Sequence, residues 1–387
     1  MKKIIVWVMV LVFATTLSLI GAGCKTEQAA ETTAAATEAA ETTAAATEAE
    51  ETTAAATEAA AEAFDMVNVP KMVGNFVFVL SHNGGTEAKE EVGNTGKWDF
   101  IGPTADNALT GQIDIVTNAV TQGYDAIILS NFGGDQVAPA CKAAQDAGLI
   151  VNTYDSPVPS AEGESVFVAQ VDFTETGKVL ADQAREILGE DGGKFVVISS
   201  NPDAANQNAW IASLEEYLKT PEYDNLEMLQ IAYTDDSAEN CYDQALAMIQ
   251  KYPDLEMFSC PHSIAIVQAC KAILDEGLED KIKVSGLGLA SEMETFCLEG
   301  ISPTFALWSF YDLGYLAYML TYRMLTGEIK GEAGETFDAG RMGTYEITPD
   351  PVRGVGLRVL MGPFKIYTAE NVSIDAAIER EAAGTGQ

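Results

Sequence analysis

The sequence predicts an α/β protein whose body folds as two similar Rossmann-like lobes, each built on a parallel β-sheet. From about residue 64, short apolar runs of strand length alternate with amphipathic segments of helix length. Strands that alternate with helices in this way form parallel sheets through right-handed crossovers. The body has about 320 residues, more than one hydrophobic core usually accommodates. Its second half repeats the element lengths of its first half, which predicts two sheets rather than one.

The amino-terminal segment has the layout of an export signal. Lys2 and Lys3 precede an apolar run over 4–20, and a short basic region followed by an apolar core directs a chain across a membrane. Small residues at 21–23 then lead to Cys24, an arrangement that resembles a bacterial lipoprotein cleavage box. We expect Cys24 to become the lipidated amino terminus and to anchor the chain. A plain secretory signal with an incidental cysteine is the alternative.

A spacer over 24–63 separates the predicted signal peptide (1–23) from the body. It contains three near-copies of the decapeptide ETTAAATEAA, at 31–40, 41–50 and 51–60. Glycine, proline and almost all large apolar side chains are missing from the segment that follows Cys24, so it cannot bury a core of its own. We expect it to hold the body away from the membrane surface.

Two segments compete for the first strand of the body. Residues 76–80 (FVFVL) have the composition of a strand, and 64–71 (FDMVNVPK) are the weaker candidate. The choice matters because Lys71 lies at the carboxyl end of the first strand only if that strand is 64–70. We favour 64–70.

The remaining elements follow in a regular rhythm. Each expected strand is a short apolar run, and such runs are typical of parallel strands that are buried on both faces. The expected strands are 126–129, 149–154, 195–198, 226–232, 257–259, 282–287 and 304–307. One expected helix ends at Gly123, and the others cover 136–147, 206–219, 237–250, 264–276 and 291–299.

Composition excludes several classes of function. The chain carries 58 acidic and 22 basic residues and a formal net charge of −36, so nucleic acids, whose phosphates repel such a protein, are not expected partners. It has 2 histidines, His82 and His262, and no motif of a serine hydrolase, zinc protease or phosphate-binding loop. The five body cysteines contain no C-x-x-C pair, and we expect most of them to be small buried apolar residues. We therefore expect neither enzymatic activity nor a metal or cofactor.

Polar residues that follow the strands are the candidates for a binding site, because ligands of open α/β sheets bind beyond the carboxyl ends of the strands. The set is mostly uncharged, with one acid and one base. The acid pair Asp235–Asp236 lies at an expected helix start, where carboxylates more often cap backbone amides. The candidates after the strands are Lys71, Asp155, Asn206, Gln207, Pro261, His262, Ser263, Trp308 and Ser309.

Several segments of the body resemble the type I periplasmic-binding proteins of sugar ABC importers. Within that family they are most similar to the autoinducer-2 receptor of the Lsr transporter and to rhamnose-receptor relatives. The segments run in family order across roughly 64–370. They are PKMVG (70–74), GPT (102–104), QGYDAII (122–128), TYDS (153–156), NQNAW (206–210), KYPDL (251–255) and LW (307–308).

The resemblance implies six ligand contacts. Lys71, Asp155, Gln207 and Pro261 match the residues that the autoinducer-2 receptor carries at these places. Two positions depart from it: Asn206 stands where that receptor has an acid, and Ser263 where it has alanine. An amide in place of a carboxylate keeps an acceptor, adds a donor and removes a charge. The ligand is therefore open between autoinducer-2, rhamnose and another simple sugar. Ribose-type receptors carry G-F-D where this chain has GLG at 286–288, and the missing acid argues against ribose or galactose.

The family fold also implies how the lobes are divided. The chain is expected to cross a hinge three times, near 171, 309 and 342. The expected N-terminal lobe is 64–171 with 309–342, the C-terminal lobe is 172–308 with 343–375, and 376–387 is a tail. Lys71 and Asp155 belong to the first lobe and the other four contacts to the second.

The functional expectation is a monomeric, lipid-anchored receptor on the extracytoplasmic side of the cell membrane. It binds a small polyhydroxylated ligand by closing its lobes and delivers that ligand to an ABC permease and its ATPase. Two other classes remain open: a sensor that presents its ligand to a membrane kinase or chemoreceptor, and a surface enzyme of the same fold.

Overall fold

The computed structural model describes residues 63–384, and these residues fold as the two-lobed α/β protein that the sequence predicts. The expected signal peptide, the lipidation site Cys24 and nearly all of the spacer lie outside the described residues. Within the described part of the chain, no helix combines the length and the apolar character that crossing a membrane requires.

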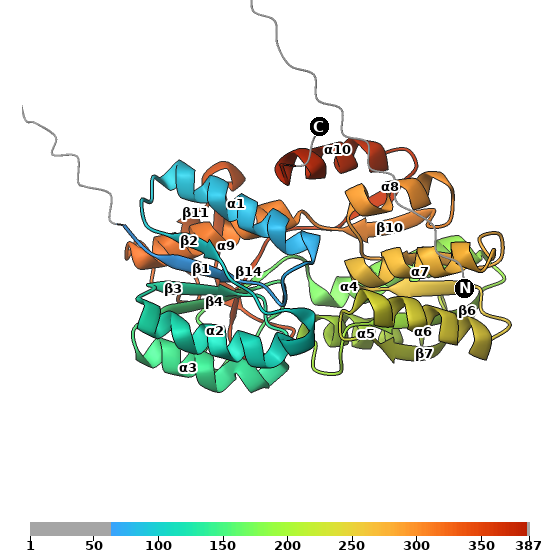
Figure 1. Cartoon of the computed structure of the whole chain (residues 1–387), viewed down its shortest axis with the longest axis horizontal. Helices are drawn as coiled ribbons and strands as arrows, with labels where there is room; N and C mark the ends of the chain where they lie inside the picture. The colour runs from blue at the N-terminus through green and yellow to red at the C-terminus, as the bar shows by residue number, and fades with distance from the viewer. Residues whose placement is uncertain (1–62, 385–387) are drawn as a thin grey trace, which may run out of the picture. The chain divides into compact units, whose positions relative to one another are not determined.

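The N-terminal lobe is built on a seven-stranded sheet with the order β13-β14-β5-β4-β3-β1-β2. All neighbouring strands are parallel except β13, which runs antiparallel to β14. Helices α1 (Phe76–Val92) and α9 (Phe310–Leu325) cover one face, and α2 (Ala108–Gln122) and α3 (Ala138–Asp146) cover the other (Figure 1). The strands are β1 (Met66–Val69), β2 (Trp98–Phe100), β3 (Ala126–Leu129), β4 (Ile150–Tyr154), β5 (Phe167–Ala169), β13 (Thr348–Pro349) and β14 (Leu357–Leu360).

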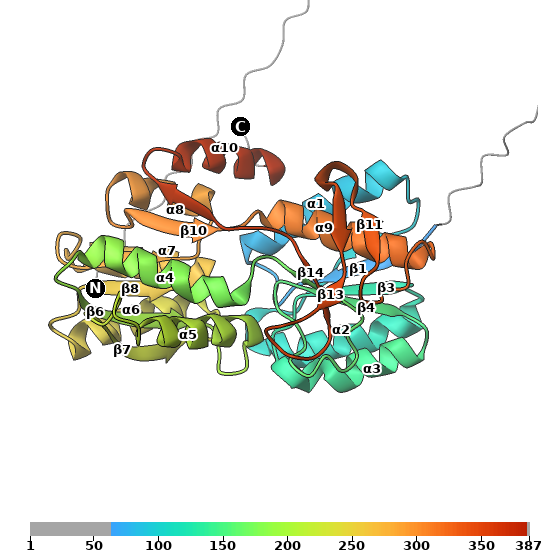
Figure 2. The same cartoon turned by 180° about the vertical axis from the view of Figure 1, so that it is seen from behind.

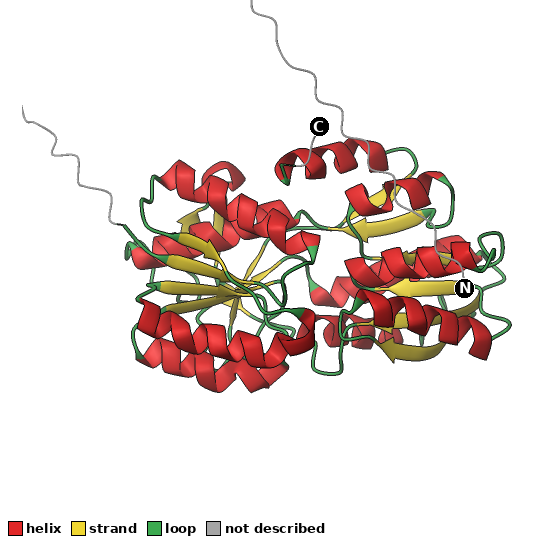
Figure 3. Cartoon of the chain, viewed as in Figure 1, coloured by secondary structure: helices red, strands yellow, loops and turns green. Residues whose placement is uncertain are grey.

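The C-terminal lobe is built on a four-stranded parallel sheet with the order β7-β6-β8-β9. Figure 2 shows α4 and α5 on one face, and Figure 1 shows α6 and α7 on the other. Colouring by secondary structure makes the common plan of the two lobes visible, with helices on both sides of each sheet (Figure 3). The strands are β6 (Gly193–Ser199), β7 (Leu226–Tyr233), β8 (Met257–Cys260) and β9 (Lys283–Gly286); the helices are α4 (Phe173–Leu188), α5 (Ala205–Tyr217), α6 (Ala238–Lys251) and α7 (Ser263–Asp275).

Smaller elements complete each lobe. Strand β10 (Thr304–Leu307) pairs antiparallel with β15 (Lys365–Thr368) beside β9, and α8 (Ala290–Leu298) packs against α10 (Val372–Ala382). The hairpin of β11 (Thr336–Asp338) and β12 (Thr344–Glu346) lies against α9. All five body cysteines are buried and unpaired, as the sequence predicts.

The choice between the two candidate first strands is settled in favour of the earlier segment. β1 pairs in parallel with both β2 and β3, whereas residues 76–80 begin helix α1. The side chain of Asn75 accepts a hydrogen bond from the backbone N–H of Val77 and so caps that helix. The apolar side chains of this segment are buried because α1 packs closely on α9. The two helices approach so closely at Gly84 that a Cβ on this residue would lie 1.8 Å from the carbonyl oxygen of Tyr311. An apolar run can be buried in a helix–helix contact as readily as in a sheet.

The assignment of 343–375 to the C-terminal lobe is wrong in part. Strand β14 pairs in parallel with β5 of the N-terminal lobe, and the chain returns to the C-terminal lobe only between β14 and β15, instead of near 342. This return could not be predicted from the sequence, because β14 has four residues and no helix follows it. The expected tail from 376 is also incorrect, since α10 extends to Ala382 and packs on α8.

Candidate functional site

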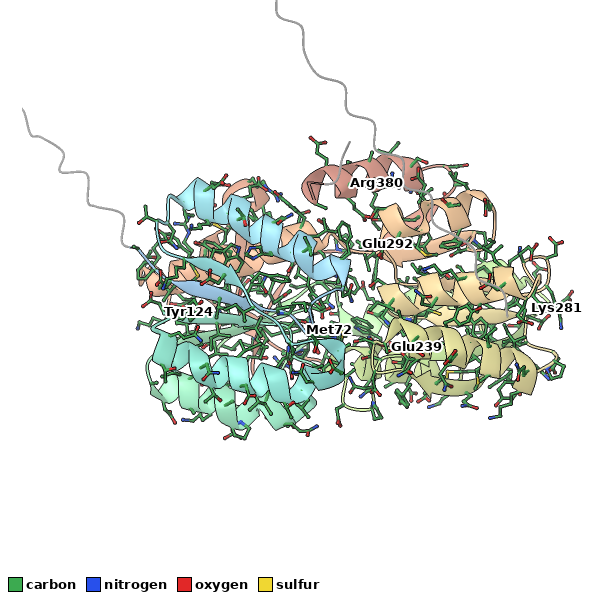
Figure 4. All side chains as sticks on the ribbon, viewed as in Figure 1. Met72, Tyr124, Glu239, Lys281, Glu292 and Arg380 are labelled. Atoms are coloured by element: carbon green, nitrogen blue, oxygen red, sulfur yellow. The ribbon has the colours of Figure 1, made fainter. Side chains whose placement is uncertain are left out.

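A cavity between the two lobes brings together all six residues for which the resemblance implied ligand contacts. Its empty volume is about 410 Å³, including the part open to solvent. Figure 4 labels Met72, the neighbour of Lys71, on the side of the N-terminal lobe that faces the other lobe. The predicted residues that line the cavity are Lys71, Asp155, Asn206, Gln207, Pro261 and Ser263.

Parallel strands of both sheets deliver these residues to the cavity, because their carboxyl ends point toward it. Lys71 follows β1 and Asp155 follows β4 in the N-terminal lobe. Asn206 and Gln207 lie in the first turn of α5, which follows β6, and Ser263 begins α7 after β8. Asp155 has φ of 60°, a left-handed conformation that is uncommon for a residue other than glycine and that recurs at functional sites.

Lys71 and Asp155 form the charged centre of the site. The Lys71 Nζ atom lies 3.4 Å from Asp155 Oδ2, and each side chain is 5% exposed. Ser130 Oγ donates to the same carboxylate oxygen at 2.8 Å, and Gln170 Nε2 donates to the backbone carbonyl of Asp155 at 3.1 Å. These bonds hold the carboxylate in one orientation, while the buried lysine balances its charge.

Asn206 joins this centre to the opposite lobe. Its Nδ2 lies 3.3 Å from both the carbonyl oxygen and the Oδ1 of Asp155, to which it donates. Its Oδ1 accepts from Lys71 Nζ at 3.2 Å and from the backbone N–H of Gln207 at 2.9 Å. The amide therefore satisfies a cation and an anion at once, which a carboxylate at this position could not do.

Gln207 and Ser263 add further polar groups from the C-terminal lobe. Gln207 Oε1 accepts from Ser199 Oγ at 2.8 Å and from the backbone N–H of Ser200 at 2.9 Å. These two bonds fix the side-chain amide so that its NH₂ group is the end left to donate to a ligand. Ser263 Oγ donates across the lobes to Asn75 Oδ1 at 3.4 Å.

Aromatic side chains supply the apolar wall of the cavity. Trp210 and Trp308 pack edge to face with ring centroids 5.6 Å apart, and Phe310 lies 5.5 Å from Trp308. Both indole N–H groups are buried without a hydrogen-bond partner within the described residues. Trp308 was among the candidates after the strands, whereas Phe78 and Phe310 were not, because their helices bring them here only in three dimensions.

Asp236 and His262 also line the cavity. His262 was among the candidates after the strands, whereas Asp236 was not expected here. The expected role of Asp236 as a helix cap is wrong, because the side chain of Ser237 caps α6. His262 Nδ1 lies 3.2 Å from Asp236 Oδ1. Burial lowers the pKa of His262, an effect that Asp236 opposes and Lys71 reinforces. Ser309, another candidate after a strand, instead caps α9 by accepting from the backbone N–H of Asp312.

Among residues 63–384, no group of three or more side chains is arranged to hold a metal ion. The cavity offers hydrogen-bond donors and acceptors, one ion pair and aromatic faces. This set can bind a small, neutral, hydroxyl-rich molecule.

Comparison with known proteins identifies the family to which the chain is similar. A family model described as a periplasmic binding protein domain matches residues 66–329. A solved ABC transporter solute-binding protein from Clostridium phytofermentas with bound L-rhamnose is 28% identical, with a TM-score of 0.77, covering 82% of this chain and 100% of that one.

Two further relatives show how far the likeness extends. LsrB from Clostridium saccharobutylicum, solved in complex with AI-2, is 24% identical with a TM-score of 0.73, covering 80% of this chain and 99% of that chain. A D-ribose/D-allose-binding protein of Pseudomonas aeruginosa is 20% identical over 224 residues, which are 56% of this chain and 68% of the relative.

Proposed function

Because the chain belongs to the periplasmic binding protein domain family, we propose that it is the solute receptor of an ABC importer and closes its two lobes over a small polyhydroxylated ligand. The ligand is autoinducer-2 or a simple sugar such as L-rhamnose. The function is binding and delivery rather than catalysis, since each polar group of the cavity can act as a hydrogen-bond partner of a bound ligand.

The observation that carries this proposal is the meeting of Asn206 with both Lys71 and Asp155. The pair comes from one lobe and the amide from the other, and each of the three residues is at most 4% exposed. A receptor of this kind gains affinity only when both lobes contact the ligand together, so ligand binding drives closure.

The chemistry of the cavity matches a neutral sugar-like ligand. Asp155 accepts protons from ligand hydroxyl groups, while Lys71 and the NH₂ group of Gln207 donate to ligand oxygens. The rings of Trp210 and Trp308 cover the C–H face of the ligand. Micromolar affinity corresponds to about 8 kcal/mol, which a few charge-assisted hydrogen bonds of about 1.5–3 kcal/mol each can supply.

Two relatives define the first ligands to test. The solute-binding protein with bound L-rhamnose is 28% identical to this chain, and the AI-2 complex of LsrB shares its fold. Asn206 and Ser263 depart from the residues expected of an autoinducer-2 receptor, and the first change removes a negative charge from the site. We therefore place L-rhamnose beside autoinducer-2 as a candidate of equal standing.

The amino-terminal segment determines where this receptor works. Lipidation of Cys24 would anchor the monomeric chain to the extracytoplasmic side of the cell membrane, and the Ala/Thr/Glu-rich spacer would let the body reach its permease, which an ATPase drives. Mass spectrometry of the amino-terminal peptide tests the anchor: a diacylated cysteine is expected for the wild type and no lipid for Cys24→Ser.

Isothermal titration of the full chain in detergent tests the ligand. L-rhamnose, autoinducer-2, D-ribose and D-galactose are titrated separately, and we expect a micromolar dissociation constant for one of the first two. Absence of binding to every one of these compounds would contradict the proposed function. Uptake of the bound ligand by vesicles that contain the permease and ATPase then separates transport from sensing.

A further inference from the structure

We propose that Asp236 and His262 form a second ligand-binding pair, which binds a ligand hydroxyl group from the C-terminal lobe and selects uncharged ligands over anionic ones. The inference rests on the proposed function and adds a specificity element to the same cavity. Neither residue belongs to the six contacts that the resemblance implied.

The two residues reach the cavity from strands on either side of β6 in the C-terminal sheet. Asp236 follows β7 and His262 follows β8, and these strands flank β6, which leads to Asn206 and Gln207. Three parallel strands of one sheet therefore end in ligand-facing polar groups. Both side chains line the cavity and are nearly buried, with 8% of His262 and 5% of Asp236 exposed.

Three polar atoms of the pair have no hydrogen-bond partner within the described residues. His262 Nδ1 and Nε2 and Asp236 Oδ1 are all buried and unsatisfied. Nδ1 lies only 3.2 Å from Oδ1, yet the two atoms are not aligned as donor and acceptor. Buried polar groups of this kind are rarely left unpaired, and a ligand hydroxyl can donate to the carboxylate while it accepts from the imidazole.

The backbone holds Asp236 in this position at a cost. Asp235 and Asp236 have φ of 53° and 54°, so two consecutive residues other than glycine adopt the left-handed conformation. The preceding residue fixes the turn, since the backbone N–H of Thr234 donates to the carbonyl oxygens of Ser199 and Ser200. Strain of this kind persists where the surrounding structure enforces it, and it is concentrated at binding and catalytic sites. Only Asp236 of the two faces the cavity, because Asp235 is exposed.

The charges that line the cavity explain the selection against anions. The titratable groups are Lys71, Asp155, Asp236 and His262. Burial lowers the pKa of His262, so the imidazole is neutral at pH 7.5. One ammonium then faces two carboxylates, and the net negative charge repels a carboxylate or phosphate group on the ligand.

The test compares three substitutions in the full chain. Asp236→Asn keeps the size of the side chain and removes its charge, and asparagine tolerates the left-handed backbone. His262→Phe fills the ring space without polar atoms. Asp235→Asn is the matched control, because it makes the same change one residue away, in the same backbone conformation and outside this cavity. Circular dichroism and the melting temperature without ligand show that each variant folds.

Isothermal titration with the neutral sugar that binds the wild type gives the readout. We expect Asp236→Asn and His262→Phe to raise the dissociation constant at least about tenfold and Asp235→Asn to change it less than about twofold. A uronic acid of the same sugar series should bind the wild type more weakly than the neutral sugar does. The difference between the two dissociation constants should be smaller in Asp236→Asn. A folded Asp236→Asn or His262→Phe variant that keeps its affinity within twofold would overturn this inference and leave the proposed function intact. If no neutral sugar binds the wild type, both fail.

Discussion

Lys71 Nζ lies 3.4 Å from Asp155 Oδ2 in the cavity between the lobes, and each side chain is 5% exposed. Both residues come from the N-terminal lobe, so the ion pair does not depend on lobe closure. A ligand bound as proposed would therefore meet a charged pair whose geometry is already formed, and only the groups of the C-terminal lobe would have to approach.

Replacing Asp155 is expected to weaken both binding and folding. Asp155→Asn removes the counter-charge of a buried lysine, and breaking such a pair from one side costs about 3–5 kcal/mol. We expect the free energy of unfolding in urea to fall by about 3 kcal/mol and the dissociation constant of the ligand to rise at least about tenfold.

The double variant Lys71→Met with Asp155→Asn provides the control for the ion pair. It leaves no unpaired charge, so it should lose less stability than the sum of the two single variants while still failing to bind. An Asp155→Asn protein with wild-type affinity would exclude the carboxylate from the ligand site.

Asn206→Asp tests the contact between the lobes. The substitution replaces the Nδ2 donor, which lies 3.3 Å from Asp155 Oδ1, by a second carboxylate oxygen. Two like charges at that distance oppose closure, so affinity should fall about tenfold or more at pH 7.5 and recover in part at pH 5. Asn208→Asp, in the same helix but outside the cavity lining, is the control. Equal affinity of wild type and Asn206→Asp at pH 7.5 would show that this bond does not contribute to closure.

Arg353 and Glu164 form a buried ion pair that positions the loop after Asp155. Arg353 Nη1 donates to Glu164 Oε1 at 2.7 Å and to the carbonyl oxygen of Val158 at 2.7 Å, and the Glu164 side chain is 1% exposed. Arg353→Met should lower the free energy of unfolding by about 3–5 kcal/mol, because it leaves that carboxylate unpaired.

An exposed pair serves as the comparison for Arg353. Arg185 Nη1 lies 2.8 Å from Glu222 Oε1, with side chains 45% and 55% exposed, and Arg185→Met should cost less than about 1 kcal/mol. Adding Glu164→Gln to Arg353→Met should restore part of the lost stability in urea unfolding. Similar losses for Arg353→Met and Arg185→Met would contradict this account.

His82 should make stability depend on pH. It stacks on Trp98 with ring centroids 5.2 Å apart, and burial lowers its pKa from 6.5 to about 4, against a smaller opposing effect of Asp99. Because the unfolded chain takes up this proton near pH 6.5 and the folded chain only near pH 4, stability is fully present above pH 6.5 and declines between these values. In His82→Gln the loss between pH 7 and pH 4.5 should be smaller than in the wild type, measured by urea unfolding. An identical pH dependence would mean that His82 titrates normally in the folded protein.

Two tryptophans should report ligand binding. The chain has 4 tryptophans; Trp210 and Trp308 line the cavity, whereas Trp98 packs against His82 and Tyr318. Ligand addition should change the intrinsic fluorescence of the wild type and of the Trp98→Phe variant. In the double variant Trp210→Phe with Trp308→Phe, the change should be much smaller. A full signal in that double variant, with unchanged affinity, would place the ligand elsewhere.

The alternation of strands and helices was readable from the sequence because buried parallel strands leave continuous apolar runs and helix ends carry glycine. The strands at 126–129 and 226–232 and the helix that ends before Gly123 lie where they were expected, within one or two residues. The six candidate contacts could be named from the resemblance, and the structure brings all of them to one cavity. Their contact with a ligand remains a prediction.

Elements that depend on distant partners were not predictable. Residues 76–80 have a strand-like composition and form a helix, because α9, more than 200 residues later in the chain, buries them. Strand β14 joins the N-terminal sheet because β5 has a free edge there, and neither a neighbouring helix nor a long apolar run marks it. Asp236 was assigned to a helix cap, because the spacing of nearby residues indicates neither its left-handed backbone conformation nor its closeness to His262.

By itself, the sequence determined the order and type of most elements, the fold class and the residue types available for a binding site, because local periodicity and strand ends are properties of short segments. Only the tertiary structure decided which side chains share the cavity, how Asn206 connects the ion pair to the opposite lobe and where the chain crosses between lobes for the third time. These features arise from contacts between segments far apart in the chain, and such contacts are selected by packing and charge in three dimensions.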